Sequence, residues 1–314
     1  MKFTVAYITC REEPNIGWFY DSLDAQLPAD LKPDLVVVDH FMKQRFLPAP
    51  HPELRRKLNR FVYTPPKPSV WQGPHRLTAV DFFSASNARN TALCYGYDSD
   101  YIVYVDDCSV LYGKWLESFM EASKSGEVIL GSYEKCAINH INDIKWIVGG
   151  RDYRLDRTLF GKEVVCSPRY LLGCTVAIPV SALVAINGWP EFHCDGMGYE
   201  DCITGVVLSN IGLACIFVRD MKIFEDEPSH HVGQKMLRID PGVSPVDKSH
   251  TMWERLKNVN YIPQDFGEEQ SMLGLKARVD HGIRWPIPKY PTHEWFTGIP
   301  LEQFHLYESR TPKQ

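Results

Sequence analysis

Short, continuous runs of apolar residues alternate with more polar segments through the first third of the chain. The runs at 3–8, 35–38 and 101–105 are rich in β-branched and aromatic residues and predict buried strands. The segments at 15–27 and 86–96 have the composition and end signals of helices. Because continuous apolar strands separated by helices are typical of a covered parallel sheet, we predict an α/β fold with a mainly parallel central sheet and helices on both faces.

The second half of the chain predicts further elements. Residues 171–178 form another apolar run. The apolar positions after Glu200 fall on one face of a helix, which Gly212 ends. In contrast, the polar stretch at 139–162 contains two adjacent glycines and predicts a flexible loop.

Composition divides the chain into three segments. Prolines are frequent after residue 235, and they exclude long regular elements there. The chain before residue 236 shows no such change in composition, and it predicts one catalytic unit made of two halves. The three segments are 1–115, 116–235 and a Pro-rich C-terminal segment, 236–314, which we expect to wrap the core.

The overall composition is that of an ordinary globular protein. Hydrophobic residues make up 44% and charged residues 23% of the 314 positions, which excludes a disordered or fibrous chain. A net charge of −5 provides no bulk attraction to a nucleic-acid backbone. Nine cysteines without CxxC spacing argue against a disulfide framework or a zinc ribbon and favour a reducing compartment. With no secretory signal and no apolar stretch of membrane-spanning length, we expect a cytoplasmic protein.

Polar side chains follow each predicted strand of the first half, where open α/β sheets bind their ligands. These residues are Thr9, Arg11 and Glu13 after the first strand, Asp39 after the second, and Asp106 with Asp107 after the third. Asp39 alone is equally well explained as a turn residue. Two adjacent carboxylates such as Asp106 and Asp107 repel one another unless they are solvated or bridged by a divalent cation. The pair therefore predicts a metal-binding or nucleotide-binding site.

Three further features add candidate residues. Neither a GxGxxG after the first strand nor a P-loop is present. A bound diphosphate would therefore need a metal ion and a cationic side chain such as Arg89. The alternative for Arg89 is a solvated charge on the surface of its helix. A glycine-containing loop brings Glu200 and Asp201 into the first turn of a helix. A helix-capping role explains one of the two carboxylates, and the other is a candidate general base toward an acceptor hydroxyl. Tandem His230 and His231 follow acidic residues and are candidate metal ligands.

In their order and spacing, these features between about residues 3 and 235 resemble the GT-A glycosyltransferases. The matching pieces are Thr9-Cys10-Arg11-Glu12-Glu13, Asp39, Ser86-Asn87-Ala88-Arg89-Asn90, Asp106-Asp107 and Glu200-Asp201. The parts most similar to the acceptor half of the family-two enzymes and the β-1,4-galactosyltransferases are Gly173–Ile178, Ile186–Pro190 and Gly198–Asp201. The resemblance implies a GT-A fold, with a nucleotide-sugar-binding half at 1–115 and an acceptor-binding and catalytic half at 116–235.

The resemblance also implies roles for the residues that bind the donor. Asp39 and Arg11 would contact the base, and Asp106 the ribose or the metal. Arg89 would help to stabilise the departing diphosphate. The full set of expected nucleotide-binding residues is Thr9, Arg11, Glu13, Asp39, Arg89 and Asp106.

A divalent cation, Mn²⁺ or Mg²⁺, is the cofactor that the resemblance implies. Asp107 would ligate it, and His230 would complete its shell, with His231 as the alternative. The chain departs from the family at one position, because Cys108 stands where the DxD motif ends in Asp. A soft thiol suits Mn²⁺ or Mg²⁺ poorly, so we expect Asp107 to take the ligand role in a shifted frame.

The implied activity is transfer of a sugar from a nucleotide-diphosphate sugar, expected to be a UDP-sugar, to an acceptor hydroxyl. Asp201 would be the base of an inverting displacement, and Glu200 would hold acceptor hydroxyls. The alternatives are a sugar-nucleotide pyrophosphorylase and a non-catalytic nucleotide-sugar-binding module, which Cys108 favours. The acceptor stays open among a glycan, a protein, a lipid-linked sugar, a small molecule and a modified nucleic-acid base.

Overall fold

The structure is a computed structural model that describes residues 1–42, 45–66, 85–156, 163–186, 188–190 and 200–230. Its strands are β1 (Phe3–Thr9), β2 (Asp34–Asp39), β3 (Arg60–Thr64), β4 (Tyr101–Asp106), β5 (Ser109–Tyr112), β6 (Val128–His140), β7 (Asp143–Arg151), β8 (Glu163–Cys166), β9 (Thr175–Pro179) and β10 (Cys215–Asp226). Its helices are α1 (Ile16–Gln26), α2 (Pro52–Lys57), α3 (Ala85–Gly96), α4 (Trp115–Ala122), α5 (Val180–Ala185), α7 (Glu200–Asn210) and α8 (Glu227–His230). Three 3₁₀ turns cover Ser123–Ser125, Tyr153–Asp156 and Pro168–Tyr170.

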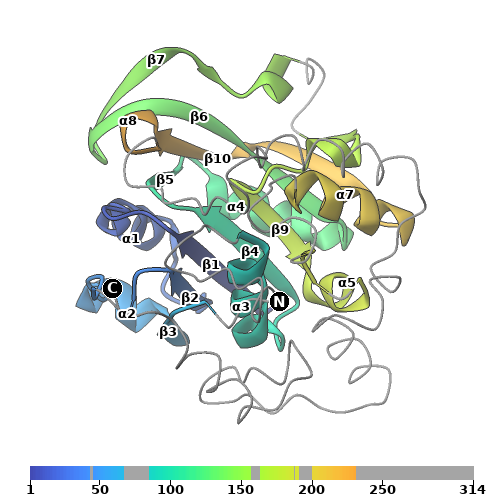
Figure 1. Cartoon of the computed structure of the whole chain (residues 1–314), viewed down its shortest axis with the longest axis horizontal. Helices are drawn as coiled ribbons and strands as arrows, with labels where there is room; N and C mark the ends of the chain where they lie inside the picture. Colours follow the sequence, from blue (N-terminus) through green and yellow to red (C-terminus); the bar gives the residue numbers. More distant parts are fainter. Residues whose placement is uncertain (43–44, 67–84, 157–162, 187, 191–199, 231–314) are drawn as a thin grey trace, which may run out of the picture.

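Within the described residues the strands form one sheet in the order β3-β2-β1-β4-β9-β6-β10-β5, with β7 beside β6 and β8 beside β10. The first four strands of this order are parallel to one another, and β10 is parallel to β6. The antiparallel strand β9 joins these two parallel groups. The sheet is thus mainly parallel, as the apolar strand pattern predicts (Figure 1).

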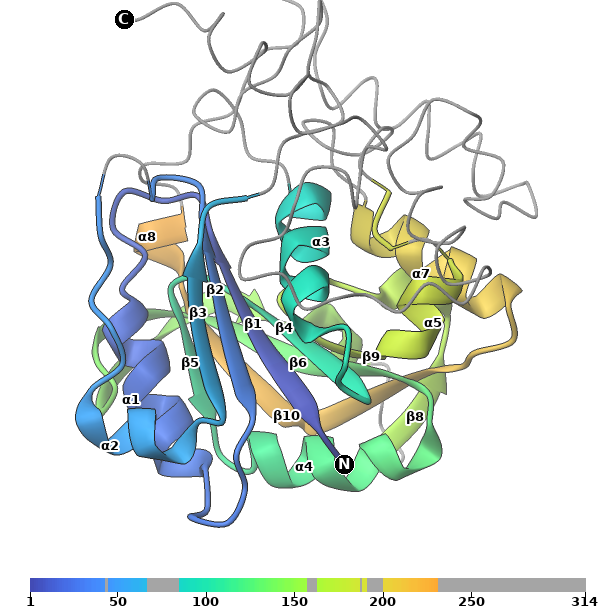
Figure 2. The same cartoon turned by 90° about the horizontal axis from the view of Figure 1, so that it is seen from below.

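Helices cover both faces of the sheet because its central strands are apolar on both sides. Residues Phe3, Val5 and Tyr7 of β1 face the layer of α1, α2 and α4, whereas Ala6 and Ile8 face the layer of α3, α5 and α7. All seven residues of β1 are buried. Figure 2 shows α4 and α3 on opposite sides of the sheet. The predicted α/β class is therefore confirmed.

Most of the predicted elements are present, with ends where the sequence places them. The predicted strands of the first half correspond to β1, β2 and β4, and the predicted helices to α1 and α3. The helix predicted from Glu200 is α7, which runs to Asn210. Gly212 follows it with a φ of 99°, a left-handed conformation that ends helices at low cost only with glycine.

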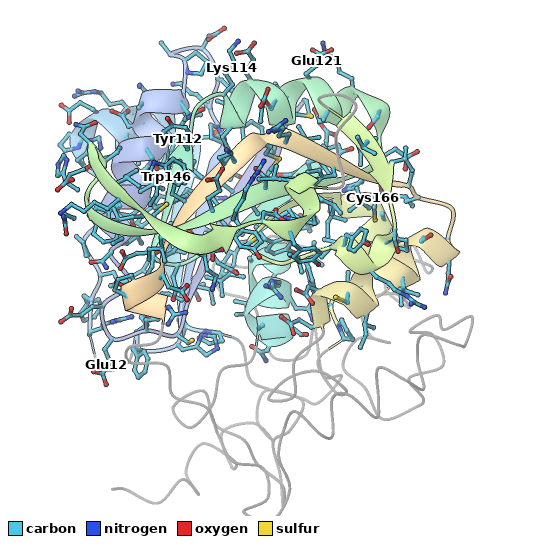
Figure 3. All side chains as sticks on the ribbon, turned by 90° about the horizontal axis from the view of Figure 1, so that it is seen from above. Glu12, Tyr112, Lys114, Glu121, Trp146 and Cys166 are labelled. Carbon is cyan, nitrogen blue, oxygen red and sulfur yellow. The ribbon has the colours of Figure 1, made fainter. Side chains whose placement is uncertain are left out.

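The flexible loop predicted at 139–162 is wrong for most of its length. Residues 143–151 instead form β7, which pairs antiparallel with β6. The ring of Trp146 packs at 5.0 Å against Phe224 of β10, and the ring of Tyr112 packs against the same residue at 4.2 Å (Figure 3). A Cβ on Gly150 would lie 2.5 Å from the carbonyl oxygen of Lys135, so the glycine allows close strand pairing.

The proposed division after residue 115 falls just after the first residue of α4, and the sheet continues across it. The segment 236–314 lies outside the described residues. No described helix combines the length and apolarity needed to cross a membrane.

Candidate active site

The carboxyl ends of β1, β2 and β4 meet at one edge of the sheet. The strand register pairs Thr9 with Asp39 and Ile8 with Asp106, so the polar residues that follow these strands become neighbours. The turn between β4 and β5, which contains Asp107 and Cys108, lies at the same edge. This is the edge at which parallel sheets bind ligands.

Asp107 is turned into the protein and is held by two of the other candidate residues. One carboxylate oxygen accepts a hydrogen bond from the Thr9 hydroxyl at 2.7 Å, and the other accepts one from Arg11 Nε at 2.7 Å. The residue is only 6% exposed. Burial raises the pKa of Asp107, while Arg11 and Thr9 act in the opposite direction. Arg11 also donates to the carbonyl of Ser229, so this cluster joins β1, β4 and α8.

Asp39 is likewise buried and fully engaged in local structure. Its carboxylate accepts hydrogen bonds from the Phe41 amide, from Tyr63 Oη at 2.8 Å and from two guanidinium nitrogens of Arg45. The neighbouring His40 contacts the Thr9 carbonyl, and burial lowers the pKa of its ring to about 4. Arg45, Tyr63 and His40 carry no motif signal, so sequence reasoning missed them.

Arg89 connects the end of β4 to the start of α7. Its Nη1 donates to Glu200 Oε1 at 2.7 Å, and its Nη2 lies 3.6 Å from Asp106 Oδ1. The guanidinium is buried and lies 4.6 Å over the ring of Trp189, a cation–π arrangement. Burial alone would lower the pKa of Arg89, but the carboxylates of Glu200 and Asp106 raise it, so the side chain stays charged.

A glycine makes room for this guanidinium. A Cβ on Gly173, which precedes β9, would lie 1.9 Å from Arg89 Nη2. Any side chain at this position would have to displace the guanidinium from its contacts with Glu200 and Trp189. The glycine is therefore required by close approach and not by backbone strain.

Asp201 lies beside this ion pair at the start of α7. Its carboxylate accepts hydrogen bonds from the amides of Gly173 at 3.2 Å and Cys202 at 2.7 Å. Burial and then the charge of Glu200 raise the pKa of Asp201 to about 6. Both Glu200 and Asp201 keep part of their surface exposed. A carboxylate with this pKa is suited to accept a proton near neutral pH.

Cys108 has a structural place in the turn after β4. Its φ of 55° is left-handed, and its amide donates to Tyr7 Oη and to the Pro14 carbonyl, both at 3.1 Å. Its Sγ donates to the carbonyl of Glu13, whose own side chain is exposed. Burial raises the pKa of the Cys108 thiol, so the thiol is neutral.

The residues expected to bind metal are only partly described. His230 ends α8 but its side chain lies outside the described residues, as does all of His231. No group of three His, Cys, Asp or Glu side chains within the described part of the chain is arranged to hold a metal ion. The Asp106 side chain is 34% exposed and is the accessible carboxylate of the pair. Mg²⁺-type sites commonly use one or two protein carboxylates together with substrate phosphates, so the edge fits such an ion with the donor present.

Comparisons with known proteins place this geometry in a known architecture. The structure superposes on TarS from S. aureus with a TM-score of 0.52 and 15% sequence identity, covering 88% of this chain and 43% of that chain. Two shorter TarS structures, in complex with UDP and with UDP-GlcNAc, give TM-scores of 0.51 and 0.50, each with 15% sequence identity. Both comparisons cover 88% of this chain, and they cover 70% of the UDP-bound chain and 71% of the UDP-GlcNAc-bound chain. The chain has a GT-A fold. It spans less than half the length of the first of these TarS chains.

Sequence comparison alone shows no family for this GT-A chain. No family model matches it. A segment of 57 residues is 39% identical to one subunit of the NADH-quinone oxidoreductase of Helicobacter hepaticus, covering 18% of this chain and 14% of that protein. A match of that extent does not identify the chain as a relative.

Proposed function

We propose that the protein is a glycosyltransferase that moves a sugar from a UDP-sugar to an acceptor hydroxyl. The observation that carries this proposal is the group of Arg89, Glu200 and Asp201, in which a carboxylate with a pKa of about 6 lies beside a buried ion pair at the ligand-binding edge of a GT-A fold. The TarS complexes with UDP and UDP-GlcNAc support the choice of donor.

The donor would lie along the ends of β1, β2 and β4. The exposed carboxylate of Asp106 would face the ribose or the cation, and the side chain of Glu13 is also exposed. Thr9 and Arg11 hold Asp107, so in this proposal they shape the nucleotide pocket by positioning the turn after β4. Asp39 would act in the same way, through its contacts with Arg45 and Tyr63.

Asp106 is the residue that we assign to a bound Mn²⁺ or Mg²⁺ ion, because both oxygens of Asp107 are already bonded to Arg11 and Thr9. Such an ion supplies positive charge that offsets the charge developing on the departing diphosphate. His230 is the second ligand that the sequence resemblance implies.

In the proposed displacement, the acceptor oxygen forms a bond to the anomeric carbon while the bond from that carbon to the diphosphate oxygen breaks. Asp201 takes the acceptor's proton, and attack from the opposite face inverts the anomeric centre. Glu200, fixed by Arg89, holds the acceptor hydroxyl in position. Arg89 acts through Glu200 and Asp106, because its guanidinium is buried.

The test is release of UDP from a panel of UDP-sugars, with and without candidate acceptors, in wild type and in Asp201→Asn. We expect UDP release to fall at least a thousandfold in the variant, a general base and its positioning together supplying that much. UDP binding measured by calorimetry should be unchanged. Turnover retained in Asp201→Asn would contradict the assigned base, and formation of UTP from UDP-sugar and pyrophosphate would favour a pyrophosphorylase.

A further inference from the structure

Glu225 is a buried carboxylate to which the proposed displacement gives no role. It lies one residue before the end of β10, and only 5% of its surface is exposed. Within the described residues its carboxylate has neither a hydrogen bond nor an ion pair. The nearby cation, Lys135, forms its ion pair with Glu227 instead, at 2.8 Å. An unpaired buried carboxylate is costly for a fold to keep. Burial raises the pKa of Glu225 to about 8, so without a cation the group holds a proton, which a cation arriving with the substrate would replace.

The strand register places Glu225 beside the turn that follows β4. Glu225 lies opposite Ser109, the first residue of β5. The next residue, Asp226, donates its amide to the carbonyl of Cys108 at 3.0 Å. Figure 2 shows α8, which continues from β10, at the same edge of the sheet as the ends of β1 and β2. The end of β10 thus meets the residues that replace the DxD motif.

Asp106 is the accessible carboxylate at this edge, and its charge acts on Glu225. Its side chain is 34% exposed, and its contact with Arg89 is a 3.6 Å approach and not a hydrogen bond. After burial, the charge of Asp106 is the largest cause that raises the pKa of Glu225, as expected for two neighbouring carboxylates. Removing their repulsion requires a proton or a cation between them.

The other acidic or sulfur ligands at this edge are already engaged. Asp107 accepts hydrogen bonds from Thr9 and Arg11, and Asp226 accepts them from Ile138 and Ser229. The Cys108 thiol donates to a backbone carbonyl and is neutral. Glu225 is therefore the available hard oxygen ligand, in addition to Asp106, among the described residues of this turn and of the end of β10.

We propose that Glu225 and Asp106 together bind the divalent cation, with the Glu225 carboxylate supplying the oxygen ligand that the DxD motif loses at Cys108. This inference rests on the proposed function, because the donor diphosphate and water would provide the remaining ligands. Two protein carboxylates suffice for such a site, since Mg²⁺-type ions keep several waters and bind substrate phosphates. Cation binding should accordingly be tighter with UDP present than without it.

The test is Mn²⁺ binding followed by electron paramagnetic resonance of free Mn²⁺, with and without UDP, in wild type and in Glu225→Gln. We expect Mn²⁺ affinity to fall at least tenfold in the variant. The matched control is Glu134→Gln, because Glu134 is a similarly buried carboxylate that pairs with Lys222 on β10. Its Mn²⁺ affinity should stay within twofold of wild type.

Thermal unfolding separates a lost ligand from a damaged fold. In EDTA, Glu225→Gln should melt no lower than wild type, because the amide removes a buried repulsion. With Mn²⁺ and UDP, wild type should gain melting temperature and the variant should gain much less. Equal Mn²⁺ affinity in wild type and Glu225→Gln would overturn this inference alone. Absence of Mn²⁺ binding to wild type would overturn both it and the metal dependence in the proposed function.

Discussion

Arg89 shows how one buried residue can join the two sides of the site. Its guanidinium stacks on Trp189 and bridges the carboxylates of Asp106 and Glu200. A buried arginine that is fully flanked in this way keeps its charge and holds its partners in fixed positions. We expect its main contribution to be the orientation of Glu200 and Asp106, in addition to any field that it exerts on the diphosphate.

The first prediction at this scale concerns Gly173. Replacing it with Ala places a methyl group 1.9 Å from Arg89 Nη2, so the guanidinium must shift and its contacts with Asp106 and Glu200 are disturbed. We expect a loss of about 1–3 kcal/mol in the free energy of unfolding, the usual range for overpacking, together with a large drop in kcat. Denaturant unfolding and UDP-release kinetics measure the two effects.

Gly17 provides the control, because a Cβ there meets no atom within 4 Å. Gly17→Ala lies in α1, and its stability should be equal to or slightly above that of wild type. A Gly173→Ala enzyme with wild-type kcat would show that the position of Arg89 does not matter for catalysis.

The second prediction is the pH dependence set by Asp201. Its pKa is raised to about 6 by burial and by Glu200, so it takes up a proton at a higher pH than an ordinary carboxyl does. Because the base must be ionised, kcat/KM should be constant above about pH 7 and should fall by about tenfold per pH unit below pH 6. A rate profile that stays flat down to pH 5 would exclude Asp201 as the base.

At the scale of elements, the turn between β4 and β5 divides two adjacent aspartates between different tasks. Asp107 points inward and joins β1 to the turn through Thr9 and Arg11, whereas Asp106 stays accessible. The left-handed Cys108 ends the strand and directs β5 along β10. Two identical side chains therefore differ because Asp106 ends the strand whereas Asp107 lies in the turn that follows it.

This division predicts opposite effects of two otherwise equivalent substitutions. Asp107→Asn removes the ionised partner of buried Arg11 and should cost about 3 kcal/mol of unfolding free energy, even in EDTA. Asp106→Asn should change the free energy of unfolding in EDTA by less than about 1 kcal/mol, as expected for an accessible side chain. It should weaken Mn²⁺ binding. Equal stability of the two variants would contradict the structural role of Asp107.

The hairpin of β6 and β7 was the largest element that sequence patterns did not predict. Residues 143–151 combine charged residues and two adjacent glycines with apolar ones, and they form an outer strand beside β6. Their pairing depends on β6 and on the contact of Trp146 with Phe224, which is 78 positions later in the chain. Long-range contacts of this kind outweigh the loop signal of the two adjacent glycines.

At the scale of the whole molecule, the two proposed halves share one sheet and its packing. β4 of the first half pairs with β9 of the second. The ring of Phe3 packs at 5.1 Å against Phe119 of α4. The described part of both halves is thus built around common hydrophobic clusters, and neither half has a complete core of its own.

This continuity predicts that the two halves unfold together. Full-length protein should show one denaturant transition by both tryptophan fluorescence and circular dichroism. A fragment of residues 1–115 should lack cooperative unfolding, because it exposes the edge of β4 and the apolar faces that α4 and α5 cover. Cooperative unfolding of that fragment would show that the first half is an independent domain.

Much of this architecture was readable from local patterns. Buried strands that need apolar residues on both faces, and helices that end at glycine, leave continuous traces in the sequence. The candidate residues at the ends of β1, β2 and β4 were placed at one edge by the same logic. The roles of Thr9 and Arg11 as partners of Asp107 were not, because they depend on side-chain directions in a turn.

The sequence by itself determined the α/β class, the main strands and helices, and the set of polar residues at the carboxyl edge, because these follow from local burial and chain order. Only the tertiary structure decided which carboxylate is buried and which is accessible. It also decided that Arg89 bridges Asp106 and Glu200 and that Glu225 lies beside the turn after β4. Most of these outcomes depend on contacts between residues about a hundred positions apart, whose energies no local pattern records.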